Sequence, residues 1–177
     1  MKLNFKRLLK KNRLKFILWF LLRFNLLAIP LYLAIYTDFS FPPLQTLITQ
    51  ITATILKIQG YNIIQNDQMM LMNVDDSIYS IEVSWDSTGW KSLYALAALV
   101  MAVPTSNIKS KLKFLSMGLP MIFVLNLIRI LTTILIALNF GFQYFEIVHT
   151  LLWREGLIIA VVALWYFWLK KETIIIR

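Results

Sequence analysis

Four stretches of mostly apolar residues recur along the chain, separated by polar segments. A helix needs about 20 apolar residues to cross the roughly 30 Å hydrocarbon core of a bilayer. The second stretch is shorter than this and ends at Pro104, and the third contains Pro120, which is expected to kink a helix. The pattern predicts four transmembrane helices, at residues 16–36, 90–103, 114–138 and 150–169.

The segment after the first span has the period of a short amphipathic helix over residues 44–58. Its apolar positions form one stripe: Leu44, Leu47, Ile48, Ile51, Ile55 and Ile58. The other faces carry glutamine, threonine and lysine. These fifteen residues are too few for a span. We therefore expect a helix that lies on, or dips into, the outer leaflet of the membrane.

Residues 60–85 change to an alternating pattern. From Tyr79 to Asp86 every second residue is apolar, which is the period of a β-strand. Residues 68–74 are expected to form the preceding strand, with Asp75 and Asp76 in the turn. The predicted fold class is thus an all-α integral membrane protein, in one domain over 1–177, with about four transmembrane helices, an interfacial amphipathic helix and a small extracellular β element.

Charge and composition agree with this topology. The mean hydropathy of +0.67 and the 59% of hydrophobic residues exclude an ordinary soluble domain. Thirteen of the 18 basic residues fall into three clusters: seven within 1–15, three at 109–113 and three at 170–177. Basic clusters mark cytoplasmic segments, so both termini are predicted to be cytoplasmic and nucleic-acid binding is disfavoured. The long apolar run after the first cluster, with no small-residue cleavage site, is expected to be an uncleaved anchor.

The chain contains no cysteine, which excludes disulfides and thiolate metal sites. No cofactor or metal is predicted.

Arg129 is the most informative residue, because it lies within an otherwise apolar helix. A guanidinium stays charged, and burying it in a membrane is costly unless it is paired or lines a polar cavity. Asn126 lies three residues before it and Thr133 four after, so the three share one helical face. A functional site is the favoured interpretation, and a purely structural contact between helices is the alternative.

Two further polar residues are predicted at the same membrane depth. Arg129 is sixteen residues past Lys113, or about 24 Å up a helix, in the outer part of the hydrocarbon core. Ser87 precedes the second span and His149 precedes the fourth, both on the outer side. Ser87 could alternatively be a helix N-cap, and His149 an interfacial histidine at a helix entry.

Three blocks of the sequence resemble the exosortase/archaeosortase family of membrane cysteine transpeptidases. They are Ser-Trp-Asp-Ser-Thr-Gly-Trp-Lys-Ser at 84–92, Asn-Leu-Ile-Arg-Ile at 126–130, and His149 with Gly156. The first block is similar to an archaeal form in which a cysteine stands at position 87. The resemblance covers residues 80–170, whereas the preceding part resembles no family that we identify.

The resemblance implies catalytic roles for Ser87 at the nucleophile position, for Arg129 and for His149. Asp86, Asn126 and Lys91 would support them. The expected partners are membrane-anchored proteins with a C-terminal signal of motif, transmembrane helix and basic cluster. A lipid or other surface acceptor would receive the cleaved protein, and the active site would face outward from the plasma membrane.

Serine at position 87 departs from the family pattern. An alcohol is much harder to deprotonate than a thiol, so we expect an inactivated form in which serine was introduced for cysteine. A natural serine-using member is the alternative. Two other functions stay open: an intramembrane serine protease with a Ser87–His149 dyad, and a non-enzymatic transporter or complex subunit.

Overall fold

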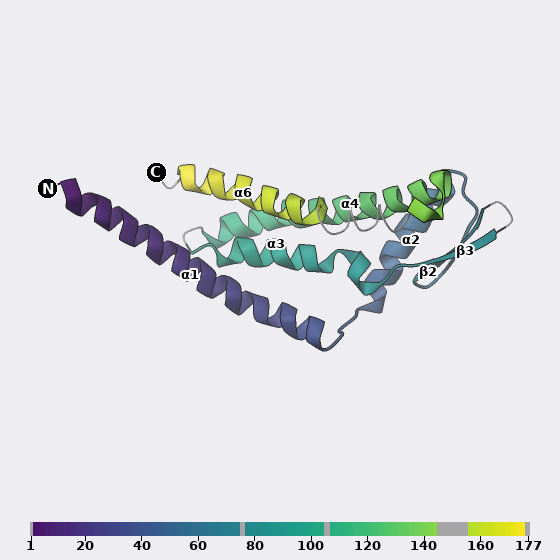
Figure 1. The fold of residues 1–177 in the computed structure, drawn as a ribbon, viewed down its shortest axis with the longest axis horizontal. Helices are drawn as coiled ribbons and strands as arrows, with labels where there is room; N and C mark the ends of the chain where they lie inside the picture. The colour runs from purple at the N-terminus through teal and green to yellow at the C-terminus, as the bar shows by residue number, and fades with distance from the viewer. Residues whose placement is uncertain (1, 75–76, 105–106, 145–155, 176–177) are drawn as a thin grey trace.

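The long helices lie alongside one another, and the small sheet lies at one end of them. The computed structural model describes residues 2–74, 77–104, 107–144 and 156–175. Both termini lie at the end away from the sheet (Figure 1). The elements in chain order are α1 (Lys2–Tyr36), α2 (Pro42–Ile58), β1 (Ile63–Asn66), β2 (Met69–Val74), β3 (Ser77–Glu82), the 3₁₀ turn η1 (Trp85–Thr88), α3 (Trp90–Ala102), α4 (Ile108–Phe140), the 3₁₀ turn η2 (Phe142–Tyr144) and α6 (Leu157–Ile175).

Two helices in the described part of the chain are long and apolar enough to cross a membrane. They are Leu14–Tyr36 within α1 and Ile108–Phe140, which is α4, and they contain the predicted spans 16–36 and 114–138. Helix α3 matches the predicted second span but has only 13 residues, about 20 Å of helix, which is less than the hydrocarbon thickness. Helix α6 overlaps the later part of the predicted fourth span, 150–169. Residues 150–155 of that span lie outside the described residues. The presence of four spans therefore stays a prediction.

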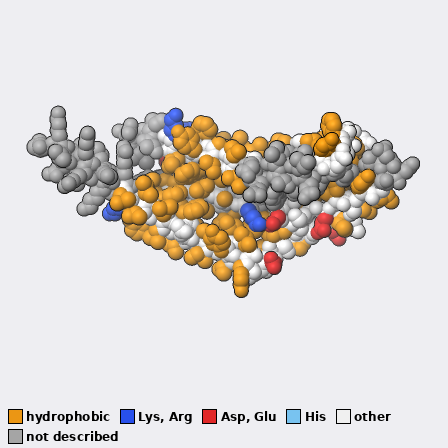
Figure 2. Space-filling view, viewed as in Figure 1, with side chains coloured by type: hydrophobic (Ala, Val, Ile, Leu, Met, Phe, Trp, Pro, Cys, Tyr) orange, Lys and Arg blue, Asp and Glu red, His pale blue; other side chains and the backbone are white. Residues whose placement is uncertain are grey.

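The surface of the helices is apolar where a lipid bilayer would contact it. Leu18, Leu26 and Leu33 of α1 are each 57% exposed. Apolar side chains cover the helical part in Figure 2, whereas acidic side chains gather toward the end with the sheet. Helix α1 packs on α3, and α3 also contacts α4 and α6. This surface fits a protein whose helices are surrounded by lipid rather than by water.

Helix α2 is present as predicted, but its buried face only partly coincides with the predicted apolar stripe. The buried face carries Gln45, Thr49 and Thr52 beside Ile48, whereas Ile58 is exposed. The reason is the sheet, since α2 packs against β1 and its polar side chains bond to the backbone of the sheet region. Gln45 Nε2 donates to the carbonyl of Val83 at 3.0 Å. Contact of the apolar stripe with the membrane stays a prediction.

The β element is a three-stranded antiparallel sheet in the order β1–β2–β3. The predicted strands at 68–74 and from Tyr79 onward correspond to β2 and β3, and the pair Met72↔Tyr79 gives their register. Two details of the prediction were wrong. The four-residue strand β1 was missed. The alternating pattern continues to Trp85, but β3 ends at Glu82, because the 3₁₀ turn capped by Ser84 begins at Trp85. The predicted turn at Asp75 and Asp76 lies outside the described residues.

Turn η1 lies between two apolar cores. One core joins α2, the sheet and the C-terminal half of α4, and the methionines Met70 and Met72 are buried in it. The other joins α3, α4 and α6 around Leu96 and Ile122. Because η1 connects the sheet to α3, it is held from both sides.

Lys111 belongs to a basic cluster that the sequence assigns to a cytoplasmic loop, yet its side chain is buried. It is 6% exposed, and its Nζ donates to the carbonyls of Met101 at 2.9 Å and Val103 at 2.6 Å. The last carbonyls of a helix have no partner within the helix, and a cation there also interacts favourably with the helix dipole. Lys111 thus caps the C-terminal end of α3 from the neighbouring helix.

We expect Lys111→Met to lower the free energy of unfolding by about 1–3 kcal/mol, because two buried carbonyls lose their donor. Lys109→Met, at an exposed position of the same cluster, is the matched control and is expected to change stability by about 0.5 kcal/mol or less. Thermal unfolding in detergent, followed by circular dichroism, measures both. Equal unfolding temperatures for the two variants would contradict the capping role.

Candidate functional site

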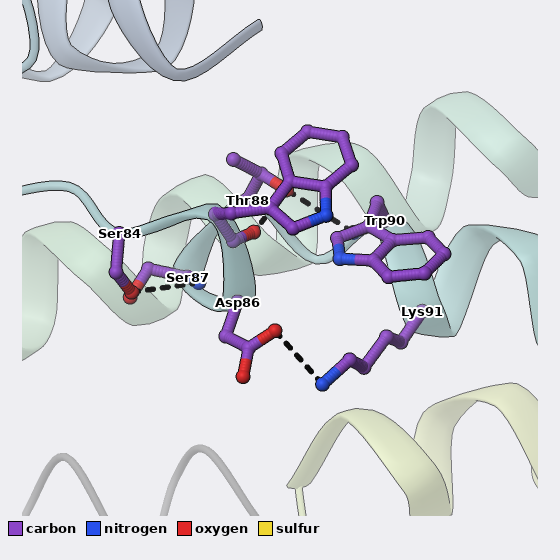
Figure 3. A network of polar contacts seen from close by, with 7 residues as sticks. Ser84, Asp86, Ser87, Thr88, Trp90 and Lys91 are labelled. Atoms are coloured by element: carbon purple, nitrogen blue, oxygen red, sulfur yellow. Dashed lines mark hydrogen bonds and ion pairs between the residues drawn. The ribbon is translucent and has the colours of Figure 1, made fainter. Parts of the chain in front are cut away.

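The turn that carries Ser87 is closed by its own hydroxyl groups. Ser84 caps η1: its backbone carbonyl and its Oγ both accept from the N–H of Ser87, at 3.0 and 3.3 Å. Thr88 Oγ1 donates to the carbonyl of Trp85 at 2.7 Å and accepts from the N–H of Trp90 at 3.4 Å. Figure 3 shows these side chains around the turn. Ser84 is the N-cap of η1 and Gly89 is the N-cap of α3, so Ser87 caps neither helix and the capping interpretation of Ser87 was wrong.

Two side chains of α4 bind the backbone of residue 87. Arg129 Nη2 donates to the carbonyl of Ser87 at 2.9 Å, and Asn126 Nδ2 donates to the same oxygen at 3.2 Å. Arg129 is only 5% exposed and Asn126 only 1%. Thr133 is buried on the same face and donates to the carbonyl of Arg129 at 2.9 Å. The predicted shared face of α4 is therefore present, and it is directed at the turn.

Gly89 makes the close approach of α4 possible. Its φ of 76° lies in the left-handed region, which favours glycine. A Cβ built on Gly89 would lie 2.7 Å from Cγ of Asn126 and 2.8 Å from its Oδ1. Position 89 therefore requires glycine both for its backbone conformation and for the space that the amide of Asn126 occupies.

The structure brings together part of the predicted constellation. Ser87, Asn126 and Arg129 meet, but the contact runs through the backbone carbonyl of Ser87. The hydroxyl of Ser87 instead lies 2.9 Å from the hydroxyl of Ser84. His149 lies outside the described residues, so its distance from the other two stays untested.

A small cavity of about 40 Å³ lies beside Ser87, between the end of the sheet and α4. Ile81, Glu82 and Val83 line it from one side, and Ile130, Thr133 and Ile134 line it from the other. The predicted site residue Ser87 thus borders empty space next to the buried arginine face.

A larger pocket of about 340 Å³ lies where the C-terminal end of α1 approaches η1 and the start of α3. Asp86 and Lys91, which the resemblance predicts to support the site, line it, and Lys91 Nζ is 2.8 Å from Asp86 Oδ1. Trp85 and Trp90 stack on each other in its wall, with ring centroids 5.2 Å apart. In Figure 3 the ion pair lies near the labelled ring of Trp90.

Sequence reasoning missed Ser84 and Asp38. A serine three residues before Ser87 is a capping signature for a short turn, so the spacing of Ser84 could have identified it. Asp38 lines the larger pocket only because α1 ends near η1, and no local pattern predicts that contact. Within the described ranges, no three His, Cys, Asp or Glu side chains are grouped as a metal site.

The comparisons with known proteins gave one match. The family model described as transmembrane exosortase matches residues 8–169, which is almost the whole chain. Neither the comparison with curated proteins nor that with solved structures gave a match. The match includes the turn at Ser87, the polar face of α4 and position 149.

We expect Gly89→Ala to destabilise the protein by about 2 kcal/mol or more, because it adds a steric clash with Asn126 to the strain of a positive φ. Gly60→Ala is the matched control: Gly60 has a φ of 93° but nothing within 4 Å of the added Cβ. It should cost only about 1 kcal/mol. Unfolding temperatures in detergent test this difference, and equal losses would mean that the contact with Asn126 does not matter.

Proposed function

The chain belongs to the transmembrane exosortase family, and on that basis we propose that it is a protein-sorting transpeptidase. The family consists of membrane cysteine peptidases and transpeptidases. The proposed substrates are membrane-anchored proteins with a C-terminal signal of motif, transmembrane helix and basic cluster. The enzyme cleaves near the motif and transfers the protein to a lipid or other surface acceptor.

One observation carries this proposal more than any other: a buried arginine from an apolar helix reaches the backbone of the residue at the nucleophile position. Arg129 Nη2 lies 2.9 Å from the carbonyl oxygen of Ser87. A purely structural arginine needs only some partner, whereas this one places a positive charge beside residue 87. A positive charge there stabilises a thiolate at position 87 or an oxyanion that forms next to it.

In the proposed mechanism, His149 takes the proton of a thiol at position 87, and the resulting thiolate attacks the scissile carbonyl carbon and forms a tetrahedral oxyanion. Arg129 stabilises the negative charge, and His149 protonates the leaving amine. The resulting thioester is then attacked by the acceptor nucleophile, which restores the thiol. Asn126 positions the turn through its hydrogen bond to residue 87, and the ion pair of Asp86 with Lys91 holds the start of α3.

The proposed topology has four spans, cytoplasmic termini and an outward-facing site. Both termini lie at one end of the helices, and α2 and the sheet lie at the other (Figure 1). Among the described acidic residues, Asp38, Asp67, Glu82 and Asp86 are on segments of the sheet end, whereas Glu172 of α6 bonds to Ser110 at the start of α4. In this proposed topology the short helix α3 begins below the outer surface of the membrane, so the proposed site is recessed.

We expect Ser87→Cys to convert an inactive or weakly active protein into an active one, because a thiol ionises near neutral pH whereas an alcohol does not. The assay reconstitutes the variant with host membrane proteins that end in the three-part signal, and measures their cleavage by gel mobility. An increase of about 100-fold or more is expected. Ser84→Cys, three residues away, is the matched control and should give no gain.

No gain in cleavage for Ser87→Cys would contradict the proposed function. Labelling of the unchanged chain at Ser87 by a fluorophosphonate would instead support the serine-protease alternative.

Arg129 has a second, independent test in the Ser87→Cys background. We expect Arg129→Gln to raise the pH at which the introduced thiol reacts with iodoacetamide by about one unit or more, because the stabilising charge is lost. Arg129→Lys should give a smaller shift. Arg23→Gln, which removes an exposed arginine of α1, is the control. An unchanged pH profile for Arg129→Gln would show that this arginine only supports the fold.

A further inference from the structure

The pocket between α1 and η1 shares a wall with the candidate site. Ser84, Trp85 and Asp86 line it, and they directly precede Ser87 in the same turn. Ser84 Oγ lies 2.9 Å from Oγ of Ser87. At about 340 Å³ the pocket is within the size range of ligand sites. A group bound there would therefore lie next to residue 87.

Aromatic rings form much of this pocket. Trp85 stacks on Trp90, and Phe39 meets Trp85 edge to face with centroids 6.0 Å apart. The face of an indole ring attracts cations, because the ring quadrupole is negative there. Lys91 already uses this property, with its Nζ 6.0 Å from the centroid of Trp90.

The charges of the described residues that line the pocket sum to one negative charge. Lys91 and Asp86 neutralise each other at 2.8 Å. In the part of the chain that the structure describes, Asp38 has no ion-pair partner. The pocket is also bordered by Ala34 and Ile35 in the last turn of α1, where the helix dipole is negative. The carboxylate of Asp38 and the negative end of the α1 dipole both favour a cationic ligand.

Asp38 occupies a position where glycine is usual. Its φ is 48°, its N–H bonds to the carbonyl of Ile35 at 3.3 Å, and the N–H of Phe39 bonds to the carbonyl of Ala34 at 2.9 Å. This is the Schellman arrangement that ends helices, in which the left-handed residue is most often glycine. The carboxylate is thus present despite a less favourable backbone conformation.

We propose that this pocket is a specificity site that binds a basic side chain, lysine or arginine, of the polypeptide processed at residue 87. The carboxylate of Asp38 and the faces of Trp85 and Trp90 would hold the cationic group. This inference rests on the proposed function and deepens it, because it names a chemical feature of the substrate.

Two features favour a polypeptide over an amine-bearing lipid. Every glycerophospholipid carries a phosphate, and the only described cation that lines the pocket, Lys91, is already paired with Asp86. In addition, an amine that attacks an acyl-enzyme must be neutral, whereas this pocket stabilises the charged form. The occupant is therefore a recognition group and not the reacting acceptor.

The test measures binding and needs no turnover, so its result is independent of the cleavage assay. Two fluorescein-labelled alanine hexapeptides differ at one position, lysine in one and norleucine in the other, and fluorescence anisotropy measures their affinity for the full chain in detergent. We expect the lysine peptide to bind about tenfold more tightly. Asp38→Asn should reduce this preference to about threefold or less.

The matched control is Asp67→Asn. Asp67 is also exposed and has a φ of 49°, but it lies in the turn between β1 and β2 and not in the pocket. Asparagine adopts this conformation readily, so both variants should fold. The lysine preference should persist in Asp67→Asn.

Equal affinity for the two peptides, or a preference that survives Asp38→Asn, would overturn the proposal. Binding of dihexanoyl phosphatidylethanolamine that depends on Asp38, without binding of the lysine peptide, would also overturn it and assign the pocket to a lipid.

Discussion

The structure depends on how one buried arginine is satisfied. A guanidinium within an apolar helix needs hydrogen-bond acceptors, and an unsatisfied one would cost several kcal/mol. For Arg129 the carbonyl of Ser87 is such an acceptor, and Asn126 donates to the same oxygen. Because a carbonyl can be placed there only if the chain before α3 turns back onto α4, this contact fixes where η1 lies. The position of η1 then determines where the sheet ends and where α3 begins.

The same contact explains why the two cavities flank residue 87. Gly89 allows the amide of Asn126 to approach the backbone, so η1 lies directly on α4. On one side the end of the sheet leaves about 40 Å³ beside Ser87, and on the other the end of α1 leaves about 340 Å³ beside Ser84. The small cavity is lined mainly by apolar side chains, whereas the large pocket carries charges and indole rings. A polypeptide bound across the turn would thus meet two different environments.

Helical periodicity predicted the elements of the site, but it could not predict their contacts. The spacing of Asn126, Arg129 and Thr133 identifies one face of α4, because side chains three and four residues apart share a face in any α-helix. The partner of that face is a backbone carbonyl, which every residue has, so no residue type marks it. Likewise, Lys111 is buried because it contacts the end of α3. Part of the apolar stripe of α2 is exposed because the polar face of α2 packs against the sheet region. The strand β1 was missed because four residues carry too little periodicity.

The hydrogen bonds of residue 87 bear on which nucleophile this site suits. The hydroxyl of Ser87 is bonded to the hydroxyl of Ser84, which is not a base, and Arg129 can only donate. Asp86, the nearest carboxylate in sequence, is paired with Lys91. Among the described residues the site thus offers positive charge beside residue 87 but no base bonded to its hydroxyl. A positive charge suffices to favour a thiolate, whereas an alcohol must pass its proton to a base in the reaction itself. The described contacts of residue 87 thus supply positive charge, and His149, which the proposed function assigns to proton transfer, lies outside the described residues.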